Sequence, residues 1–285
     1  MKISIITINY NNRDGLERTI ISVISQTYKD IQYIVIDGGS TDGSKEVINK
    51  HHEYIDYWVS EHDKGIYNAM NKGVDKATGD YLLFLNSGDC LHSKSTINDS
   101  IQYLTTNEDL VMGQVQLIPS GRIAWDDIKS SITMKDFYVG GPIPHQACFI
   151  KHELFDHLRY DESFKIVSDW KFFMQLIVFK GCSYKIIKYI ISDFEEGGIS
   201  SDRYACDKER ELVFKQLLPK AILLDYWNFS NGYGIEKNNY MSFFSDIQKY
   251  NPLYCRYVYL VILWITKVLS WIKPSLRFAR SYKSK

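Results

Sequence analysis

The side chains best suited to chemistry follow a short apolar run in the first third of the chain. Residues 81–85 read Tyr-Leu-Leu-Phe-Leu and predict a buried strand. Asn86, Ser87, Gly88 and Asp89 follow it directly. A carboxylate at the exit of a buried strand lies where open α/β sheets bind ligands, and it suits a hard divalent cation on phosphate oxygens. Taken alone, the pattern equally fits a loop with a turn-forming Asp.

The elements that must position these side chains alternate between strand and helix. Apolar, β-branched runs predict strands at 3–8, 33–36 and 57–59, before the strand at 81–85. Helical spacing of apolar residues predicts a helix at 14–26 and further helices after the second and third strands. This alternation predicts βαβ units and a parallel sheet.

Every predicted strand ends in polar or acidic residues. A doubly wound sheet brings such ends to one edge, so they form a pocket for a polar ligand, and the glycine-containing turns beside them suit a nucleotide. The chain has no GxGxxG after the first strand and no GxxxxGK[ST], which argues against dinucleotide redox enzymes and P-loop NTPases. The four strand ends are Asn9 to Asn11, Asp37, Asp63 and Asp89.

The composition is that of a folded protein with unevenly spread charge. The 285 residues are 45% hydrophobic and 14% aromatic, enough for one large domain with an extension. The formal net charge is zero, but residues 252–285 hold seven Lys or Arg and no acid. The acidic main body argues against nucleic acid, and the basic tail argues for an anionic partner. Five cysteines without a CxxC pair indicate a reducing compartment and no zinc site.

Seven stretches between residues 5 and 200 form a longer pattern. They are IITINYNN, SVISQTY, IVIDGGSTDGS, DKGIYNAMNKGVDKATGDYLLFLNSGD, HQACFI, SDW and GGIS. In this order and spacing they resemble the family 2 glycosyltransferases, which have the GT-A fold. The version with GIYNAMNKG and FLNSGD is similar to transferases that build bacterial capsule, exopolysaccharide or lipopolysaccharide.

The resemblance implies a fold and a division into domains. The GT-A fold is a Rossmann-like α/β fold with a mostly parallel sheet flanked by helices. The catalytic domain would span residues 1–202, with a nucleotide-sugar-binding half at 1–106 and an acceptor-binding half at 107–202. Residues 203–285 would form a helical C-terminal extension.

The resemblance also implies a binding site for the nucleotide sugar. Asp37 stands where the family holds the base or ribose, and the loop after the first strand flanks the base. The segments that begin at Asp63 and Asn86 would line the nucleotide and the donor sugar. The residues so implied are Asn9, Tyr10, Asn11, Asp37, Gly38, Asp63, Gly65, Asn71, Asn86, Ser87 and Gly88.

Asp89 stands at the last position of the family's acidic DxD-type motif. There it would bind Mg²⁺ or Mn²⁺ on the donor diphosphate. The sequence departs from the family here, because Asn86 and Gly88 stand where many members have further Asp residues. Asp89 would then be the only protein carboxylate on the metal, which leaves a strict metal requirement open.

Two motifs supply the acceptor side. His145 and Gln146 follow a rigid Gly-Pro loop; alone, His145 fits a structural histidine better, whereas the family places an HQ pair near the donor sugar and acceptor. Asp169 begins a predicted helix, so its carboxylate either caps that helix or acts as the general base that the family places here. Residues 195–200 form a Gly-containing loop and a candidate lid.

Together these features predict an inverting glycosyltransferase. It would move a sugar from a nucleotide-diphosphate donor, by default a UDP-sugar, to a hydroxyl of a lipid-linked glycan in bacterial surface polysaccharide biosynthesis. The alternative, suggested by the depleted acidic motif, is a non-catalytic nucleotide- or sugar-binding protein on the same fold. Release of nucleoside diphosphate from a panel of nucleotide sugars would separate the two.

The C-terminal tail predicts contact with a membrane surface. Residues 254–272 are apolar and aromatic, but Arg256 and Lys267 lie inside them, which disfavours a full span. Tyr and Trp suit the headgroup level, and the basic residues that follow suit anionic lipid, so an interfacial helix is expected. The alternative is a helix packed on the catalytic domain. A lipid-linked acceptor would place this peripheral protein on the cytoplasmic face of the bacterial inner membrane.

Overall fold

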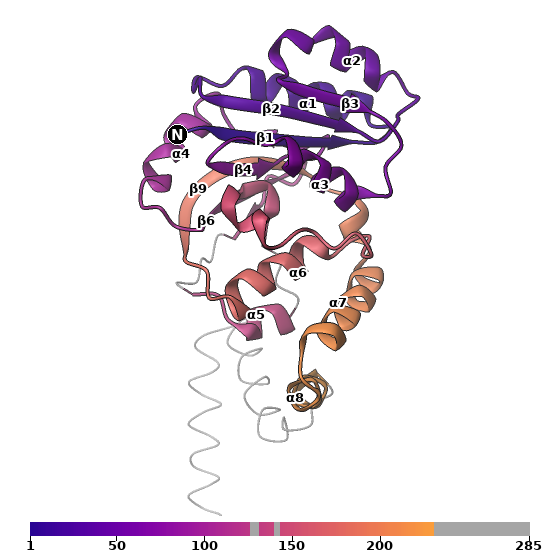
Figure 1. Cartoon of the computed structure of the whole chain (residues 1–285), viewed down its shortest axis with the longest axis vertical. Coiled ribbons are helices and arrows are strands. Elements are labelled where there is room, and N and C mark those ends of the chain that lie inside the picture. The colour runs from indigo at the N-terminus through magenta and orange to yellow at the C-terminus, as the bar shows by residue number, and fades with distance from the viewer. Residues whose placement is uncertain (126–130, 140–142, 231–285) are drawn as a thin grey trace, which may run out of the picture. The chain divides into compact units, whose positions relative to one another are not determined.

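The fold is described by a computed structural model of residues 1–125, 131–139 and 143–230, with side chains to residue 225 (Figure 1). The chain divides into two compact units, Met1–Leu217 and Leu218–Lys285. The described part of the second unit consists mainly of the helix α8 (Lys220–Ser230). No described helix has the length and apolarity to cross a membrane. The tail predicted to meet a membrane lies outside the described residues.

One mixed sheet forms the centre of the first unit. Among the described residues its order is β3-β2-β1-β4-β8-β6-β9-β5, and β7 pairs with β6 outside this path. The strands are β1 (Ile3–Asn9), β2 (Ile31–Asp37), β3 (Tyr57–Ser60), β4 (Tyr81–Phe84), β5 (Cys90–Leu91), β6 (Leu110–Ile118), β7 (Ile123–Ala124), β8 (Cys148–Lys151) and β9 (Tyr184–Glu195).

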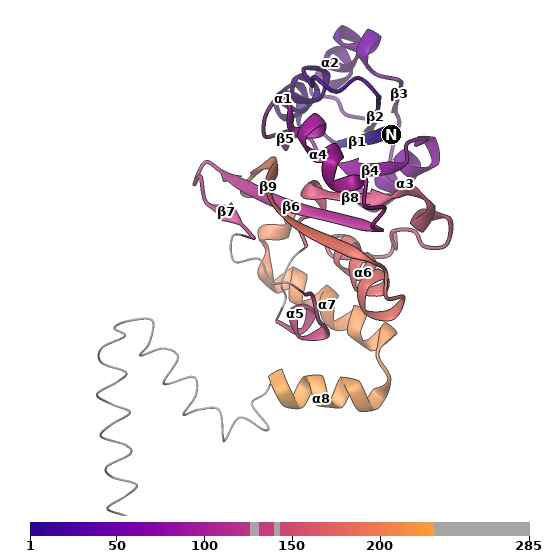
Figure 2. The ribbon, with the colours of Figure 1, turned by 90° about the vertical axis from the view of Figure 1, so that its left-hand side faces the viewer.

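The direction of the strands differs between the two halves of the sheet. β1 to β4 are parallel, which confirms the βαβ prediction. Beyond β4 the sheet is mixed: β8 is antiparallel to β4 and β6, while the long strands β6 and β9 run parallel to each other (Figure 2). The α/β fold is therefore confirmed, and its parallel character is concentrated in the N-terminal half, where helices alternate with strands.

Helices cover both faces of the parallel strands (Figure 1). They are α1 (Arg13–Ile24), α2 (Ser44–Lys50), α3 (Ile66–Lys76) and α4 (Thr96–Leu104). A Cβ added to Gly73 of α3 would lie 2.4 Å from Ile6 Cγ2, so a glycine is required for α3 to lie this close to β1. The opposite face of the strands packs against α1, α2 and α4.

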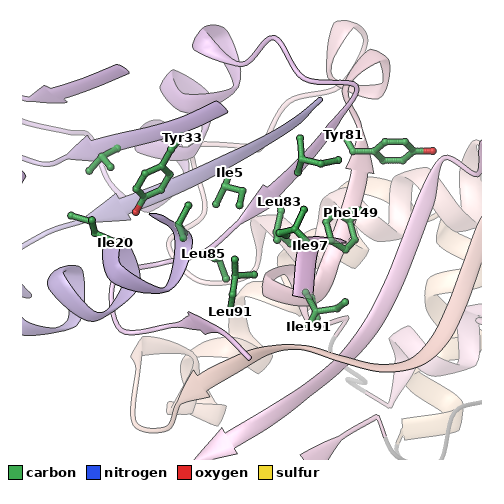
Figure 3. Close-up of a cluster of buried hydrophobic side chains, with 14 of the residues drawn as sticks. Ile5, Ile20, Tyr33, Tyr81, Leu83, Leu85, Leu91, Ile97, Phe149 and Ile191 are labelled. Atoms are coloured by element: carbon green, nitrogen blue, oxygen red, sulfur yellow. The ribbon is translucent and has the colours of Figure 1, made fainter. Parts of the chain in front are cut away.

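One buried cluster ties the two halves of the sheet together (Figure 3). It includes Ile5 of β1, Leu83 of β4, Phe149 of β8 and Ile191 of β9, all fully buried. Burying each such side chain contributes about 1.5–3 kcal/mol. Leu85, just past β4, belongs to the same cluster, so the loop that begins at residue 86 has a fixed starting point.

The strand order reverses at β1, because β2 and β3 lie on one side of it and β4 on the other. Ligands of open α/β sheets bind outside the carboxyl ends of strands at such a point. Backbone pairing continues past β4 there, since Ser87 N–H donates to the Ile8 carbonyl at 3.0 Å. The loop of residues 86–89 therefore begins as an extension of the sheet.

Helix α1 holds this loop from the side. Asn12 Nδ2 donates to the Ser87 carbonyl at 2.9 Å. The Thr19 hydroxyl accepts from Gly88 N–H at 3.0 Å and donates to the Asp89 carbonyl at 2.7 Å. Gly88 has φ 108°, a conformation that other residues adopt only with strain. The backbone that carries Asp89 is thus fixed by one hydroxyl and one glycine.

Three more helices complete the described fold: α5 (Met134–Tyr138), α6 (Ser168–Met174) and α7 (Arg203–Leu217). Although α7 lies past the predicted end of the catalytic domain at residue 202, it belongs to the first unit. The Glu209 carboxylate of α7 accepts hydrogen bonds of 2.9–3.1 Å from the backbone N–H groups of residues 165–167, just before α6. The predicted limits 1–202 and 203–285 otherwise stay a prediction.

We predict that Thr19→Val loosens the loop of residues 86–89. Valine keeps the shape of threonine but leaves two buried backbone groups without their partner, at about 1–3 kcal/mol for each group. Hydrogen–deuterium exchange should become faster at the Gly88 amide, and the free energy of unfolding should fall. Thr19→Ser keeps the hydroxyl and should retain the protection. Unchanged exchange at Gly88 in Thr19→Val would contradict this role of Thr19.

Candidate active site

A cavity of about 940 Å³ lies at the exit of β4. Its lining comes from the loop of residues 86–89, the start of α3, the segment around residue 145, α6, the end of β9 and α7. Its volume is in the range of small-molecule sites. The cavity brings together Asp89, His145, Gln146 and Asp169, which the sequence had singled out in distant parts of the chain.

Asp89 is a buried carboxylate with one unsatisfied oxygen. The residue is 3% exposed, and among the described residues its Oδ2 has no hydrogen-bond partner. Burial raises the pKa of Asp89 to about 7, and the nearby charge of Glu195 adds to the rise. The charge of His145 and backbone hydrogen bonds act in the opposite direction. An unpaired buried charge is costly, so this oxygen is suited to bind a cation.

The donor set at Asp89 fits Mg²⁺ or Mn²⁺ held partly by substrate. Mg²⁺ is commonly bound through one or two carboxylates, with phosphates and waters as its other ligands. Within the described part of the chain, no group of three or more His, Cys, Asp or Glu is arranged to hold a metal ion. Metal binding by Asp89, with phosphate and water as the other ligands, stays a prediction.

Asp169, His145 and Asn86 form a hydrogen-bonded row across the cavity. His145 Nδ1 lies 3.0 Å from Asp169 Oδ2, and His145 Nε2 lies 3.3 Å from Asn86 Nδ2. The Tyr67 hydroxyl donates to Asp169 Oδ1 at 2.9 Å. The side chains of His145 and Asp169 are only 18% and 17% exposed. The row joins the β4 loop to the start of α6.

The two ends of the His145–Asp169 contact shift each other's pKa. Burial alone would raise the pKa of Asp169, but the hydrogen bond and charge of His145, with the Tyr67 hydroxyl, bring that pKa below its ordinary value. Burial alone would lower the pKa of His145, but the hydrogen bond and charge of Asp169 bring it above its ordinary value. The pair is therefore a carboxylate and an imidazolium at mildly acid pH.

The protonated imidazole also accounts for Asn86. Among the described residues Asn86 Oδ1 has no hydrogen-bond partner. An imidazolium donates from both ring nitrogens. With the Asn86 amide turned by 180°, Oδ1 accepts Nε2–H from His145. In this orientation Asn86 Oδ1 accepts a hydrogen bond from His145 only while Nε2 carries a proton.

The helix-capping alternative for Asp169 is wrong. The N-cap position of α6 is Val167, and no side chain caps the helix. Asp169 lies inside the first turn, with its carboxylate bonded to His145 and Tyr67. A hydroxyl of a ligand reaches this carboxylate by replacing one of these two partners or by approaching beside them.

Tyr10, Gly38 and Asp63 meet at the carboxyl ends of the first three strands. A Cβ added to Gly38 would lie 3.1 Å from Asp63 Oδ2 and 3.2 Å from Tyr10 Cδ2. The Tyr10 side chain is exposed, and an exposed aromatic ring can stack on a base. Lys72 pairs with the other oxygen of Asp63. This group fits the predicted nucleoside end of the site, although it lies outside the lining of the cavity.

Asp37 anchors loops in this structure. It is fully buried, and its carboxylate accepts hydrogen bonds from Asn9 Nδ2 at 2.7 Å and from the Ser60 hydroxyl at 2.6 Å. The Ser40 hydroxyl and N–H also donate to it. These bonds lower the pKa of Asp37 although burial alone would raise it. Direct contact of Asp37 with a base stays a prediction and requires one serine to move.

Two predicted asparagines clamp the backbone. Asn11 donates its N–H to Ser40 Oγ at 2.7 Å, and its Oδ1 accepts from Thr41 N–H at 2.9 Å. Asn71 bonds the carbonyl and the N–H of Tyr160 at 2.9 and 3.1 Å. Asn71 is not part of the cavity lining, and its contact with the nucleotide or the donor sugar stays a prediction. Gly65, with φ 124°, provides the turn into α3.

Sequence reasoning missed Tyr67. Burial and the charge of Asp169 raise the pKa of Tyr67, so its hydroxyl remains a donor at all relevant pH values. Its place inside the GIYNAMNKG motif was the available signal. The prediction used only the glycines, the Asn and the apolar stripe of that motif. Thr19 and Asn12 were missed as well, since their partners lie 70 and 75 residues away.

Comparisons with known proteins identify the family of this chain. A sequence model described as "Glycosyl transferase family 2" matches residues 4–159. An uncharacterized glycosyltransferase of Mycobacterium tuberculosis is 32% identical over 208 residues, 70% of this chain and 78% of the relative. A PGL/p-HBAD biosynthesis glycosyltransferase of the same species is 29% identical over 228 residues, 78% of this chain and 85% of the relative.

A solved structure shows the same fold. S. aureus TarS 1–349, crystallised in complex with UDP-GlcNAc, superposes with a TM-score of 0.64 at 18% identity, over 82% of this chain and 76% of that chain. The match covers 43% of the longer TarS chain in another crystal structure. The fold is that of the GT-A glycosyltransferases. The chain belongs to glycosyl transferase family 2.

We predict that His145 and Asp169 stabilise the fold together within a limited pH window. The contribution of Asp169 is complete above its ordinary pKa of 3.8 and is lost as pH falls through its lower folded value. The contribution of His145 is complete below its ordinary pKa of 6.5 and is lost as pH rises through its higher folded value. The coupling should therefore be full between these two ordinary values.

A double-mutant cycle of His145→Gln and Asp169→Asn measures this coupling in denaturant unfolding. We expect about 1–3 kcal/mol near pH 5.5 and a smaller value near pH 9. Both substitutions keep hydrogen-bonding groups of similar size, so cavity effects are small. Equal coupling at the two pH values would contradict an ion pair.

Proposed function

We propose that this chain is an inverting glycosyltransferase that moves a sugar from a nucleotide-diphosphate donor to a hydroxyl of a lipid-linked glycan. The observation that carries the proposal is one cavity that holds both the unpartnered oxygen of Asp89 and the Asp169–His145 pair. A UDP-sugar is the proposed donor, supported by the likeness of the fold to TarS. The relative named for PGL/p-HBAD biosynthesis supports a biosynthetic role, which we assign to bacterial surface polysaccharides.

The donor end of the site fits a diphosphate. Asp89 would hold Mg²⁺ or Mn²⁺, which when bound supplies positive charge that stabilises the leaving diphosphate. Thr19 and Gly88 fix the backbone of Asp89, so little reorganisation accompanies the reaction. The exposed Tyr10 ring and Asp63 lie at the neighbouring strand ends, where the nucleoside would bind.

The acceptor end of the site fits a general base. The lowered pKa of Asp169 keeps it ionised at neutral pH, ready to take a proton from an acceptor hydroxyl. A carboxylate is a weak base towards such a hydroxyl, so the proton would move as the new bond to the anomeric carbon forms. Tyr67 and His145 hold the carboxylate in place. Attack from the side opposite the diphosphate inverts the anomeric configuration.

The second candidate is a non-catalytic nucleotide- or sugar-binding protein. It is favoured by Asn86 and Gly88 in the acidic motif, which leave Asp89 as the single carboxylate of that motif. The same loop also supports the catalytic proposal, because Asn86 belongs to the hydrogen-bonded row that ends at Asp169. A protein that only binds a nucleotide has no need of a positioned carboxylate at the far end of the cavity.

Release of nucleoside diphosphate from UDP-, GDP- and dTDP-sugars, with bacterial membrane extract as acceptor, tests the function. We expect release with one nucleotide class and a roughly 100- to 1,000-fold lower kcat/KM in Asp89→Asn. The variant should unfold at the same or a higher denaturant concentration, because the substitution removes an unpaired buried charge.

The control is Asp30→Asn, at an exposed carboxylate that pairs with the N-terminal amine. It should release nucleoside diphosphate like the unaltered protein. If the folded, unaltered protein releases nothing from any donor, the non-catalytic alternative is supported. Near-normal turnover in Asp89→Asn would contradict the assignment of Asp89 as a metal ligand.

We also propose a peripheral position on the cytoplasmic face of the bacterial inner membrane. The basis is the sequence of the tail, with its aromatic run and its seven basic residues after residue 252. Each basic residue near anionic lipid contributes about 1 kcal/mol. The proposed lipid-linked acceptor would lie in the same membrane.

We predict that the full chain sediments with anionic vesicles at low salt and that deletion of residues 253–285 abolishes this. Neutral vesicles should bind less of the full chain, because the electrostatic part of the attraction is lost. Hydrolysis of the donor sugar should persist in the shortened chain, which serves as the test of its folding. A full chain that stays in solution beside anionic vesicles would contradict the membrane proposal.

A further inference from the structure

Glu195 lies over the loop that carries Asp89. It is the last residue of β9, and a Cβ added to Gly88 would be 2.6 Å from Glu195 Oε2. The carboxylate therefore occupies the space directly against the Gly88 backbone, on the cavity side. Glu195 also adjoins Asp89: its backbone N–H hydrogen-bonds to that carboxylate and lowers the Asp89 pKa, while its charge raises that pKa to a smaller extent. The Glu195 carboxylate thus stands beside the loop at which the proposed function places a cation and a diphosphate.

Asp89 is covered in this arrangement. Only 3% of the residue is exposed, and the unpartnered Oδ2 is buried. A ligand reaches that oxygen only after a neighbouring group moves. Glu195 can move, because its side chain is 52% exposed and Gly197 and Gly198 follow it with open space around them.

Arg18 holds Glu195 in this position. One of its guanidinium nitrogens donates to Glu195 Oε2 at 2.7 Å, and Arg18 is 51% exposed. An exposed ion pair of this kind contributes only about 0–1 kcal/mol, so it exchanges partners easily. Arg18 precedes Thr19, whose hydroxyl binds the backbone of residues 88 and 89. Helix α1 therefore carries, in consecutive positions, the guanidinium that pairs with Glu195 and the hydroxyl that binds the loop of residues 86–89.

A phosphate and a carboxylate offer Arg the same oxygen geometry. If a diphosphate binds to a cation at Asp89, it needs the space above Gly88 and is repelled by the charge of Glu195. Once Glu195 leaves, Arg18 has lost its partner beside that space. A phosphate oxygen then takes the place of the carboxylate oxygen, at no net loss of ion pairs.

We propose that Glu195 occupies the diphosphate position in the ligand-free protein and that Arg18 binds the donor diphosphate by exchanging Glu195 for a phosphate oxygen. This inference rests on the proposed function, since it takes the donor diphosphate to bind at Asp89. It assigns to Arg18 and Glu195 opposite effects on the affinity for the same ligand.

Calorimetric titration of the full chain in Mg²⁺ tests the exchange. The probes are UDP, GDP and dTDP, each compared with its monophosphate. Arg18→Gln should weaken binding of the diphosphate roughly tenfold, as expected for one lost charge-assisted hydrogen bond, and should affect the monophosphate much less. Glu195→Gln should strengthen binding of the diphosphate several-fold, because the competing charge is gone.

The matched controls are Arg159→Gln and Glu153→Gln, which break exposed ion pairs with Asp75 and Lys151 elsewhere on the surface. They should bind the probes like the unaltered protein. Tighter binding in Arg18→Gln would show that Arg18 only latches Glu195, and weaker Mg²⁺-dependent binding in Glu195→Gln would show that Glu195 binds the cation. Either result overturns the exchange.

The test separates this inference from the function on which it rests. If the unaltered chain binds no nucleoside diphosphate, the proposed donor is wrong and the exchange is overturned with it. If the unaltered chain binds one and both variants bind it equally well, the donor site stands and the exchange alone is overturned.

Discussion

A buried carboxylate with one unpartnered oxygen among the described residues is the constraint on which the rest of this site depends. Asp89 is inserted at the strand exit by the buried strand β4 and held there by Thr19 and the left-handed Gly88. Because burial penalises its charge, a cation bound at Asp89 Oδ2, as proposed, would stabilise the ionised carboxylate. The fold thus places this unpartnered oxygen at the point where the strand order reverses. In the proposed function, a cation carried by the donor diphosphate would bind to it.

The other half of the site has the opposite character, because its charges already satisfy each other. Among the described residues, the Asp169 carboxylate bonds the side chains of His145 and Tyr67, which come from separate segments of the chain. This arrangement keeps the carboxylate ionised and oriented before any ligand arrives. The cavity therefore has one end with an unpartnered carboxylate oxygen and one end with a paired carboxylate, which the proposed function assigns to the leaving diphosphate and to the acceptor hydroxyl.

The sequence predicted the elements and the residues whose role is local. The parallel strands followed from buried β-branched runs, and Asp89 followed from the polarity change at the end of one run. The pattern could not show that the Asp37 carboxylate accepts hydrogen bonds from Asn9 and Ser60. Nor could it show that the Asn71 side chain bonds the backbone of Tyr160. It could not show the Arg18–Glu195 pair either, since these residues are 177 positions apart. Such contacts depend on the order in which the strands pair in the sheet, which the spacing of residues along the chain does not give.

The most direct measurement is anomalous diffraction from crystals of this protein grown with Mn²⁺ and the nucleoside diphosphate of its donor. The account predicts a manganese peak bonded to Asp89 Oδ2, with a phosphate oxygen above Gly88 and Glu195 displaced from that position. A peak on other carboxylates, such as Asp63, with Glu195 still in place against Gly88, would contradict the account.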